Sequence, residues 1–167
     1  MLWKRNVCLV FNSFGNGKAA IEGLETANDC ITSQFTKHRA VAINDLILIG
    51  KYNAQAQTGS VKSSRGIHIF NYNTLKDNED SKTVIQNCEI SNFKNSGINV
   101  VYGDFAKIIN AKIDGNNIHD CGTIGIELSF IWYSKSVISN NIIHDIYGIK
   151  KGSSIYTGIG IQMSLCK

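Results

Sequence analysis

Proline is absent from this chain of 167 residues, and Cys-x-x-Cys pairs and long apolar runs are absent too. The lack of proline excludes collagen-like and proline-rich linker proteins. Because the five cysteines form no metal-binding or disulfide pattern, we expect free thiols that are buried or half-buried. No apolar run approaches the length of a transmembrane helix, so no membrane partner is predicted.

Excess charge of one sign is also small. The 17 basic and 13 acidic residues give a formal net charge of +4, and the lysines are scattered along the chain. This distribution does not predict a nucleic-acid partner. The first twenty residues begin with basic side chains, but their apolar run is short and interrupted by Asn and Gly, so we recognise no signal peptide.

β-Branched and turn-forming residues are abundant instead. The chain has 25 isoleucines against 8 leucines, together with 15 glycines. Isoleucine favours strands, and glycine and asparagine favour sharp corners. The hydrophobic content of 43% is ordinary for a globular domain, so we expect one all-β domain.

The second half of the chain repeats one pattern three times. Each copy has a strand, an Asn- or Gly-containing corner, an isoleucine, a polar bend and then Gly-Ile-x-aliphatic. The copies are residues 83–100, 111–128 and 136–163. Their equivalent isoleucines Ile90, Ile118 and Ile143 are 28 and 25 residues apart. This period predicts a solenoid, in which each repeat buries its apolar face against its neighbours.

A fainter copy precedes these three. Residues 40–50 place Ile47 at the position of Ile90, an offset of 43, and residues 65–69 supply the Gly-Ile element. Residues 1–39 are either an imperfect earlier repeat or a capping segment. We therefore divide the chain into residues 1–39 and a repeat region, 40–167, which we expect to be truncated because it ends directly after a strand.

Period-two alternation within the repeats predicts which side chains face inward. Two inward ladders are expected: Ile67, Ile98, Ile126 and Ile161, and then Ile69, Val100, Leu128 and Met163. A shared corner is expected at Asn44, Asn87, Gly115 and Asn140, where left-handed backbone geometry is needed and stacked amides can hydrogen-bond.

A leucine-rich repeat is the nearest alternative solenoid, but its L-x-x-L-x-L spacing is missing here. The repeats instead contain the segments NDLILIG, NCEISNF, GNNIHDC and NNIIHDI, paired with GIHI, GINV, GIEL and GIQM. In these segments the chain resembles the right-handed parallel β-helix superfamily of pectate-lyase-like proteins. The resemblance implies a right-handed parallel β-helix solenoid of about four to five coils with polar loop insertions. Members include polysaccharide lyases, glycoside hydrolases, epimerases and phage tailspike depolymerases.

Alternation also predicts an outward-facing polar ladder of His68, Asn99, Glu127 and Gln162. The segments after these strands add aromatic residues suited to stacking on sugars: Tyr72, Tyr102, Phe130, Trp132 and Tyr133. Glycoside hydrolysis needs two carboxyl groups, for which Glu127 and Asp104 are the candidates. A lyase needs a base, for which His68 or a nearby lysine such as Lys107 is a candidate. The alternative is that these residues only solvate the surface.

A second constellation consists of His119-Asp120 and His144-Asp145, 25 residues apart. Stacking would place His over His, where the pair could bind a divalent metal, shuttle protons or simply form a polar bend. The other repeats carry Ser91-Asn92 and Leu48-Ile49 at the equivalent positions. We predict no resident metal or other cofactor, although the acidic patch of Asp77, Glu79 and Asp80 could attract Ca²⁺.

The resemblance implies a carbohydrate-active protein that binds and cleaves a polysaccharide, as a lyase or a glycoside hydrolase. The alternative is a non-enzymatic structural or adhesive module. The likeness to tailspike depolymerases further implies a homotrimer in a virion-associated or extracellular setting.

Overall fold

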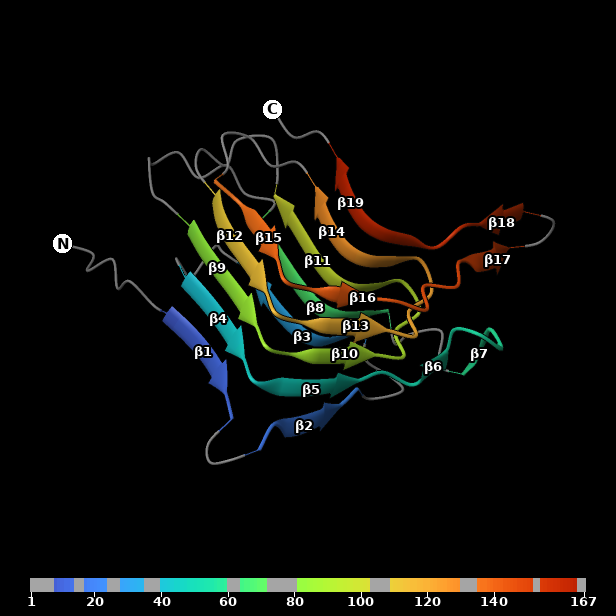
Figure 1. Cartoon of the computed structure of the whole chain (residues 1–167), viewed down its shortest axis with the longest axis horizontal. Coiled ribbons are helices and arrows are strands. Elements are labelled where there is room, and N and C mark those ends of the chain that lie inside the picture. The colour runs from blue at the N-terminus through green and yellow to red at the C-terminus, as the bar shows by residue number, and fades with distance from the viewer. Residues whose placement is uncertain are drawn as a thin grey trace.

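The chain folds, in a computed structural model, into three parallel β-sheets (Figure 1). The structure describes residues 8–13, 17–23, 28–34, 40–59, 64–71, 81–102, 109–129, 135–151 and 154–164. The regular secondary structure in these ranges is entirely β, which confirms the all-β prediction.

Each large sheet has five strands, and the chain adds one strand to each in turn, five times. Sheet A contains β1 (Cys8–Asn12), β4 (Ala40–Asn44), β9 (Ser81–Gln86), β12 (Ile109–Asp114) and β15 (Val137–Ser139). Sheet B contains β2 (Ala19–Glu22), β5 (Leu46–Ile49), β10 (Glu89–Ser91), β13 (Asn117–His119) and β16 (Ile142–Ile143). Sheet C contains β3 (Asp29–Gln34), β8 (Arg65–Asn71), β11 (Ser96–Tyr102), β14 (Ile124–Ser129) and β19 (Ile159–Ser164). We call each series of one A, one B and one C strand a pass.

Two antiparallel hairpins extend from the same place in different passes, between the sheet B and sheet C strands (Figure 1). The first joins β6 (Tyr52–Asn53) to β7 (Thr58–Gly59), and the second joins β17 (Ile149–Lys151) to β18 (Ser154–Tyr156). The polar insertions at residues 51–65 and 147–157 therefore occupy equivalent positions in their passes. Most of a third polar insertion, residues 72–80, lies outside the described residues.

The predicted inward ladders are confirmed by the strand register. Ile67 pairs with Ile98, Ile98 with Ile126, and Ile126 with Ile161. The first three of these side chains are completely buried in one hydrophobic core. Ile161 and Met163, by contrast, are 47% and 57% exposed, because β19 is an edge strand of sheet C.

The strand register confirms the two repeat spacings in the second half of the chain. It also corrects the alignment of the fainter repeat at residues 40–50. Ile90 pairs with Ile118, and Ile118 with Ile143. The prediction for Ile47 is wrong, because Leu48 lies opposite Ile90. The true offset is therefore 90 − 48 = 42. Leu48 is completely buried, so the register that places Leu48 inward also keeps the core apolar.

The corner between sheets A and B has the left-handed geometry predicted for it. Backbone φ is +54° at Asn87, +67° at Gly115 and +54° at Asn140. In the second pass the left-handed residue is Asp45, with φ +56°, so the prediction of Asn44 is wrong by one position. Aspartate also tolerates this conformation, and the sequence Asn-Asp offered two candidates.

A stack of side-chain amides follows this corner by one residue. Asn116 Nδ2 donates to Asn141 Oδ1 at 2.9 Å and to the Ile85 carbonyl at 3.1 Å. Asn116 Oδ1 accepts a hydrogen bond from the Cys88 amide at 3.0 Å, and Asn141 Nδ2 donates to the Ile113 carbonyl. Asn116 is 1% exposed, so these contacts satisfy backbone groups that water does not reach. Amide stacking along the passes is thus present, but at Asn116 and Asn141 rather than at the corner residues.

The glycines of the first three Gly-Ile elements, Gly66, Gly97 and Gly125, allow neighbouring passes to pack closely. A Cβ added at Gly97 would lie 2.5 Å from the γ2 methyl of Ile118, and one added at Gly125 would lie 2.5 Å from that of Ile143. These distances are shorter than a carbon–carbon contact allows. The recurring glycine is therefore required by packing.

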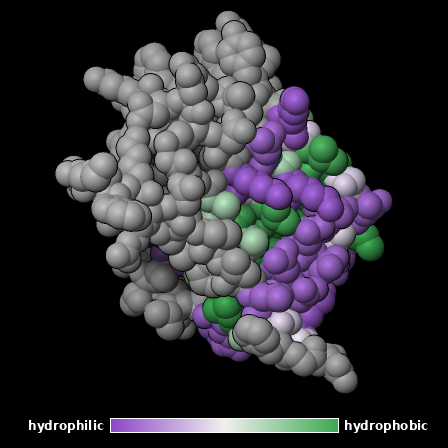
Figure 2. Space-filling view, turned by 90° about the vertical axis from the view of Figure 1, so that its left-hand side faces the viewer, coloured by the Kyte–Doolittle hydropathy of each residue, from purple (hydrophilic) through white to green (hydrophobic). Residues whose placement is uncertain are grey.

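The outer face of sheet A is polar and organised around Asp114. Its carboxylate accepts hydrogen bonds from Ser139 Oγ (2.8 Å), Asn140 Nδ2 (2.9 Å) and Gln86 Nε2 (3.3 Å), and Lys112 Nζ lies 3.3 Å away. These contacts, led by Ser139, lower the pKa of Asp114 to about 2. Hydrophilic side chains predominate among the described residues seen from this side, with hydrophobic atoms between them (Figure 2).

Three cysteines behave as the sequence predicts. Cys88 and Cys121 are buried and Cys30 is half-buried, and all three are free thiols. Burial raises the pKa of Cys30 to about 11 and that of Cys121 to about 12, so neither is a reactive thiolate. The side chain of Cys8, and the whole of Cys166, lie outside the described residues.

Candidate functional site

The polar ladder predicted on sheet C is one continuous row of side chains. His68 pairs with Asn99, Asn99 with Glu127, and Glu127 with Gln162. Since the neighbouring isoleucines and Val100 are buried in the core, alternation directs this row to the opposite face. The row also includes Thr32, opposite His68, which the sequence reading missed because residues 1–39 were not aligned with the repeats.

The row is less accessible than an outward-facing strip was expected to be. His68 is 5% exposed and Asn99 is 3% exposed, whereas Glu127 and Gln162 are half-buried. Buried polar side chains need hydrogen-bond partners. One hydrogen bond, from Asn99 Nδ2 to Glu127 Oε2 at 2.6 Å, joins two members of the row, and Asn99 Oδ1 is buried without a partner among the described residues. The accessible positions therefore lie at the two ends of the row: Thr32, which is exposed, and the half-buried Glu127 and Gln162.

Glu127 is held by three neutral donors. Asn99 Nδ2 donates to Oε2 at 2.6 Å, Ser96 Oγ donates to Oε2 at 3.2 Å, and Ser129 Oγ donates to Oε1 at 3.3 Å. Among the described residues, no ion pair involves this carboxylate. Donors on both oxygens fix the orientation of the carboxyl group, which proton transfer or nucleophilic attack at a bound sugar would require.

His68 belongs to a compact charged cluster with Asp29 and Arg65. Asp29 accepts from Arg65 Nε at 2.6 Å, Arg65 Nη2 at 3.2 Å, Thr32 Oγ1 at 3.1 Å and His68 Nδ1 at 3.1 Å. Burial raises the pKa of Asp29, but the hydrogen bonds from His68 and Arg65 outweigh it and hold this pKa below its ordinary value. Asp29 and Arg65 were not predicted as site residues, since they lie 36 residues apart in the sequence.

Both ring nitrogens of His68 are engaged. Nδ1 contacts Asp29, and Nε2 lies 3.3 Å from Arg65 Nη1. The neutral tautomer that donates from Nδ1 and accepts at Nε2 satisfies both contacts. Its ring also stacks on Phe70, with centroids 4.7 Å apart and planes at 27°. To act as a base, His68 would have to release the contact with Arg65.

Most of the other predicted site residues cannot be located. Tyr72, Asp104, Lys107, Phe130, Trp132 and Tyr133 lie outside the described residues, as do Asp77, Glu79 and Asp80. Tyr102 ends β11, but its side chain is not among those described. Whether the aromatic residues gather beside Glu127 stays a prediction.

The second constellation has the predicted stacking. The rings of His119 and His144 have centroids 5.1 Å apart and planes at 5°. Each Nδ1 lies 2.7 Å from Oδ2 of the following aspartate, Asp120 or Asp145. Both aspartates have a backbone φ of +52° and form the corner after sheet B.

Register confirms Ser91 as the equivalent of His119 in the preceding pass. One pass earlier the equivalent is Ile49, so the predicted Leu48-Ile49 pair is wrong by one residue and Ile49-Gly50 takes its place. This is the same shift that corrects Ile47. Within the described part of the chain, no group of three or more His, Cys, Asp or Glu side chains is arranged to hold a metal ion.

A scan against protein-family models found no matching family, and searches of curated proteins and of solved structures found no match to this chain. In the described ranges there is no helix long and apolar enough to cross a membrane.

Proposed function

We propose that this chain is a carbohydrate-active module built as a right-handed parallel β-helix, which binds a polysaccharide and cleaves it. Three observations support the helical winding: three parallel sheets, one strand per sheet in each pass, and left-handed corners at equivalent positions. The pairing of β1, β2 and β3 with the second pass supports treating residues 8–34 as a first coil rather than as a separate cap.

The row of polar side chains on sheet C is the observation that carries the proposal. Neighbouring strands are about 4.8 Å apart, so the row presents a hydrogen-bonding group at regular intervals along the stacked passes. An extended sugar chain lying along them has hydroxyl groups to meet such a row. Glu127, half-buried and fixed by three neutral donors, is the carboxyl group best prepared for catalysis among the described residues.

Hydrolysis fits this site better than elimination does. Glu127 accepts hydrogen bonds on both oxygens, which suits a nucleophile or base, with Asp104 as the proposed second carboxyl group. A lyase using His68 as base would first have to break its contact with Arg65. The proposed reaction is therefore glycoside hydrolysis, with polysaccharide elimination as the second reaction to be tested.

A depolymerisation screen tests the proposal. The folded chain is incubated with a panel of acidic and neutral polysaccharides, and both new reducing ends and the ultraviolet absorbance of unsaturated uronate products are measured. Reducing ends without that absorbance are expected. Glu127→Gln should remove the activity while preserving the circular dichroism spectrum, whereas Asp114→Asn, which removes the same charge from sheet A, should retain it. Full turnover by Glu127→Gln would exclude Glu127 as the catalyst.

The second candidate is a non-enzymatic structural or adhesive module. The burial of His68 and Asn99 favours it, because both side chains are engaged inside the protein, His68 with Asp29 and Asn99 with Glu127. Under this alternative the screen is silent for a protein whose folding has been verified. The homotrimer and the virion-associated or extracellular setting are proposed from the resemblance alone, and sedimentation of the purified chain tests the trimer.

A further inference from the structure

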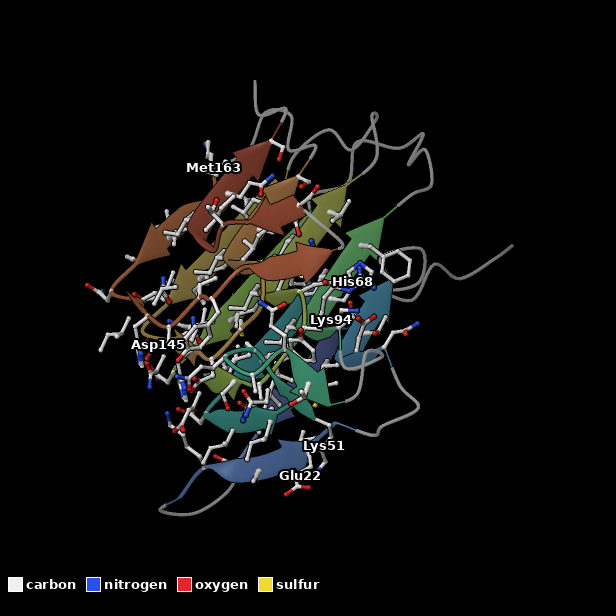
Figure 3. All side chains as sticks on the ribbon, turned by 90° about the vertical axis from the view of Figure 1, so that its right-hand side faces the viewer. Glu22, Lys51, His68, Lys94, Asp145 and Met163 are labelled. Carbon is white, nitrogen blue, oxygen red and sulfur yellow. The ribbon has the colours of Figure 1, made fainter. Side chains whose placement is uncertain are left out.

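The stacked histidines lie apart from the polar row and call for a separate explanation. Their neighbours Ile118 and Ile143 pack in or against the core, so the imidazoles point away from it, on the outer face of sheet B. Figure 3 places Asp145, beside His144, well away from His68. We propose that His119 and His144 form an open site for a divalent transition-metal ion.

The tautomers of both rings suit metal binding. A carboxylate accepts, so the 2.7 Å contacts require the proton of each imidazole to lie on Nδ1. The lone pair of each Nε2 is then available to an ion. Proteins orient histidine ligands in the same way: one ring nitrogen donates to a carboxylate, and the other binds the metal ion. The aspartates are thus positioning residues rather than ligands.

The surroundings favour a cation and allow it to enter. The side chains of His119 and His144 are 20% and 47% exposed, so an ion can approach both rings from solvent. Glu89 Oε1 lies 3.8 Å from His119 Nε2, beyond hydrogen-bonding distance, and adds negative charge beside it. Tyr147 Oη donates a hydrogen bond to Asp120 Oδ1 at 3.4 Å, while Oδ2 of the same carboxylate contacts His119.

The site is open. Because the described residues offer no cage of three or more ligands, two imidazoles would bind the ion and water would complete its coordination. Imidazole ligands suit Cu²⁺, Ni²⁺ and Zn²⁺, with Cu²⁺ bound most tightly, and do not suit Mg²⁺ or Ca²⁺. The site is independent of the proposed polysaccharide function, since it lies on another sheet.

Isothermal titration calorimetry on the full chain, prepared without a histidine tag, tests the site. We expect Cu²⁺ to bind more tightly than Ni²⁺ or Zn²⁺, and Mg²⁺ and Ca²⁺ not to bind. His119→Gln and His144→Gln should each abolish binding of Ni²⁺. Paramagnetic broadening by Cu²⁺ in NMR spectra should be centred on these two imidazoles.

The positioning role has its own matched control. Asn, like Asp, tolerates the left-handed corner, so Asp120→Asn with Asp145→Asn removes the carboxylates and keeps the backbone. This double variant should weaken Ni²⁺ binding about 10–100-fold. Asp45→Asn makes the same change at the equivalent left-handed position of the other corner and should leave the affinity unchanged. The proposal is overturned if the wild-type chain binds none of the three transition ions, or if both histidine variants keep their affinity.

Discussion

Replacing Gly97 with alanine tests whether contact between passes is what requires the repeated glycine. The added Cβ would lie 2.5 Å from the γ2 methyl of Ile118 and 3.0 Å from the Gly125 carbonyl oxygen. Ile118 is completely buried, so its methyl has no free space into which to move. Gly160 occupies the same position in the last pass, where the added Cβ would lie 3.9 Å from the nearest methyl, that of Ile143.

The two alanine variants isolate the cost of the clash. Overpacking a core costs about 1–3 kcal/mol. A Gly→Ala change that the backbone tolerates gains about 0.4–1 kcal/mol by restricting the unfolded chain, and this gain is common to both variants. Neither glycine has a φ in the left-handed region, so both backbones accept alanine. Gly97→Ala should therefore be less stable than Gly160→Ala by the overpacking cost alone, about 1–3 kcal/mol.

Thermal unfolding followed by circular dichroism measures this difference. For a chain of this length, 1 kcal/mol corresponds to about 2–4 °C in Tm. Leucine has no methyl group on Cβ, so Gly97→Ala should cost less on an Ile118→Leu background than in the wild type. Equal Tm values for Gly97→Ala and Gly160→Ala, or an unchanged cost on the leucine background, would refute the argument from packing.

Two further predictions concern the polar contacts that join the passes. Asn116→Ala should destabilise the chain by about 1–3 kcal/mol or more in urea unfolding, because it leaves the buried Cys88 amide without a partner. A loss no greater than that of Gln86→Ala, a half-buried position in strand β9, would contradict this. The pKa of Asp114 is lowered to about 2, so its contribution to stability is complete above the ordinary pKa of 3.8 and is lost as pH falls through about 2. Asp114→Asn should therefore lose less stability over that pH range than the wild type, and parallel acid-unfolding curves would count against the assignment.

Much of the fold could be predicted from the sequence because strand alternation is a local property. In residues 65–163 the period of two and the recurring Gly-Ile element correctly paired the inward ladders. The spacings of 28 and 25 correctly paired Ile90, Ile118 and Ile143. The predictions for Ile47 and Asn44 were wrong by one position. Asn44 and Asp45 both tolerate a left-handed corner, and only the packing of Leu46 and Leu48 decides between them. Of the candidate site, alternation gave the row of His68, Asn99, Glu127 and Gln162 but not the hydrogen bonds that hold it.

The sequence by itself determined the strand content, the repeat period and the side of each strand that faces the core, because these follow from the periodicity of neighbouring residues. Only the tertiary structure decided what each polar residue contacts. It brought Asp29 and Arg65 to His68, surrounded Glu127 with neutral donors, and oriented the rings of His119 and His144 with carboxylates. The physical reason is that burial and hydrogen bonding depend on groups that come together only when the passes stack, and Asp29 and His68, 39 residues apart, carry no mutual signal along the chain.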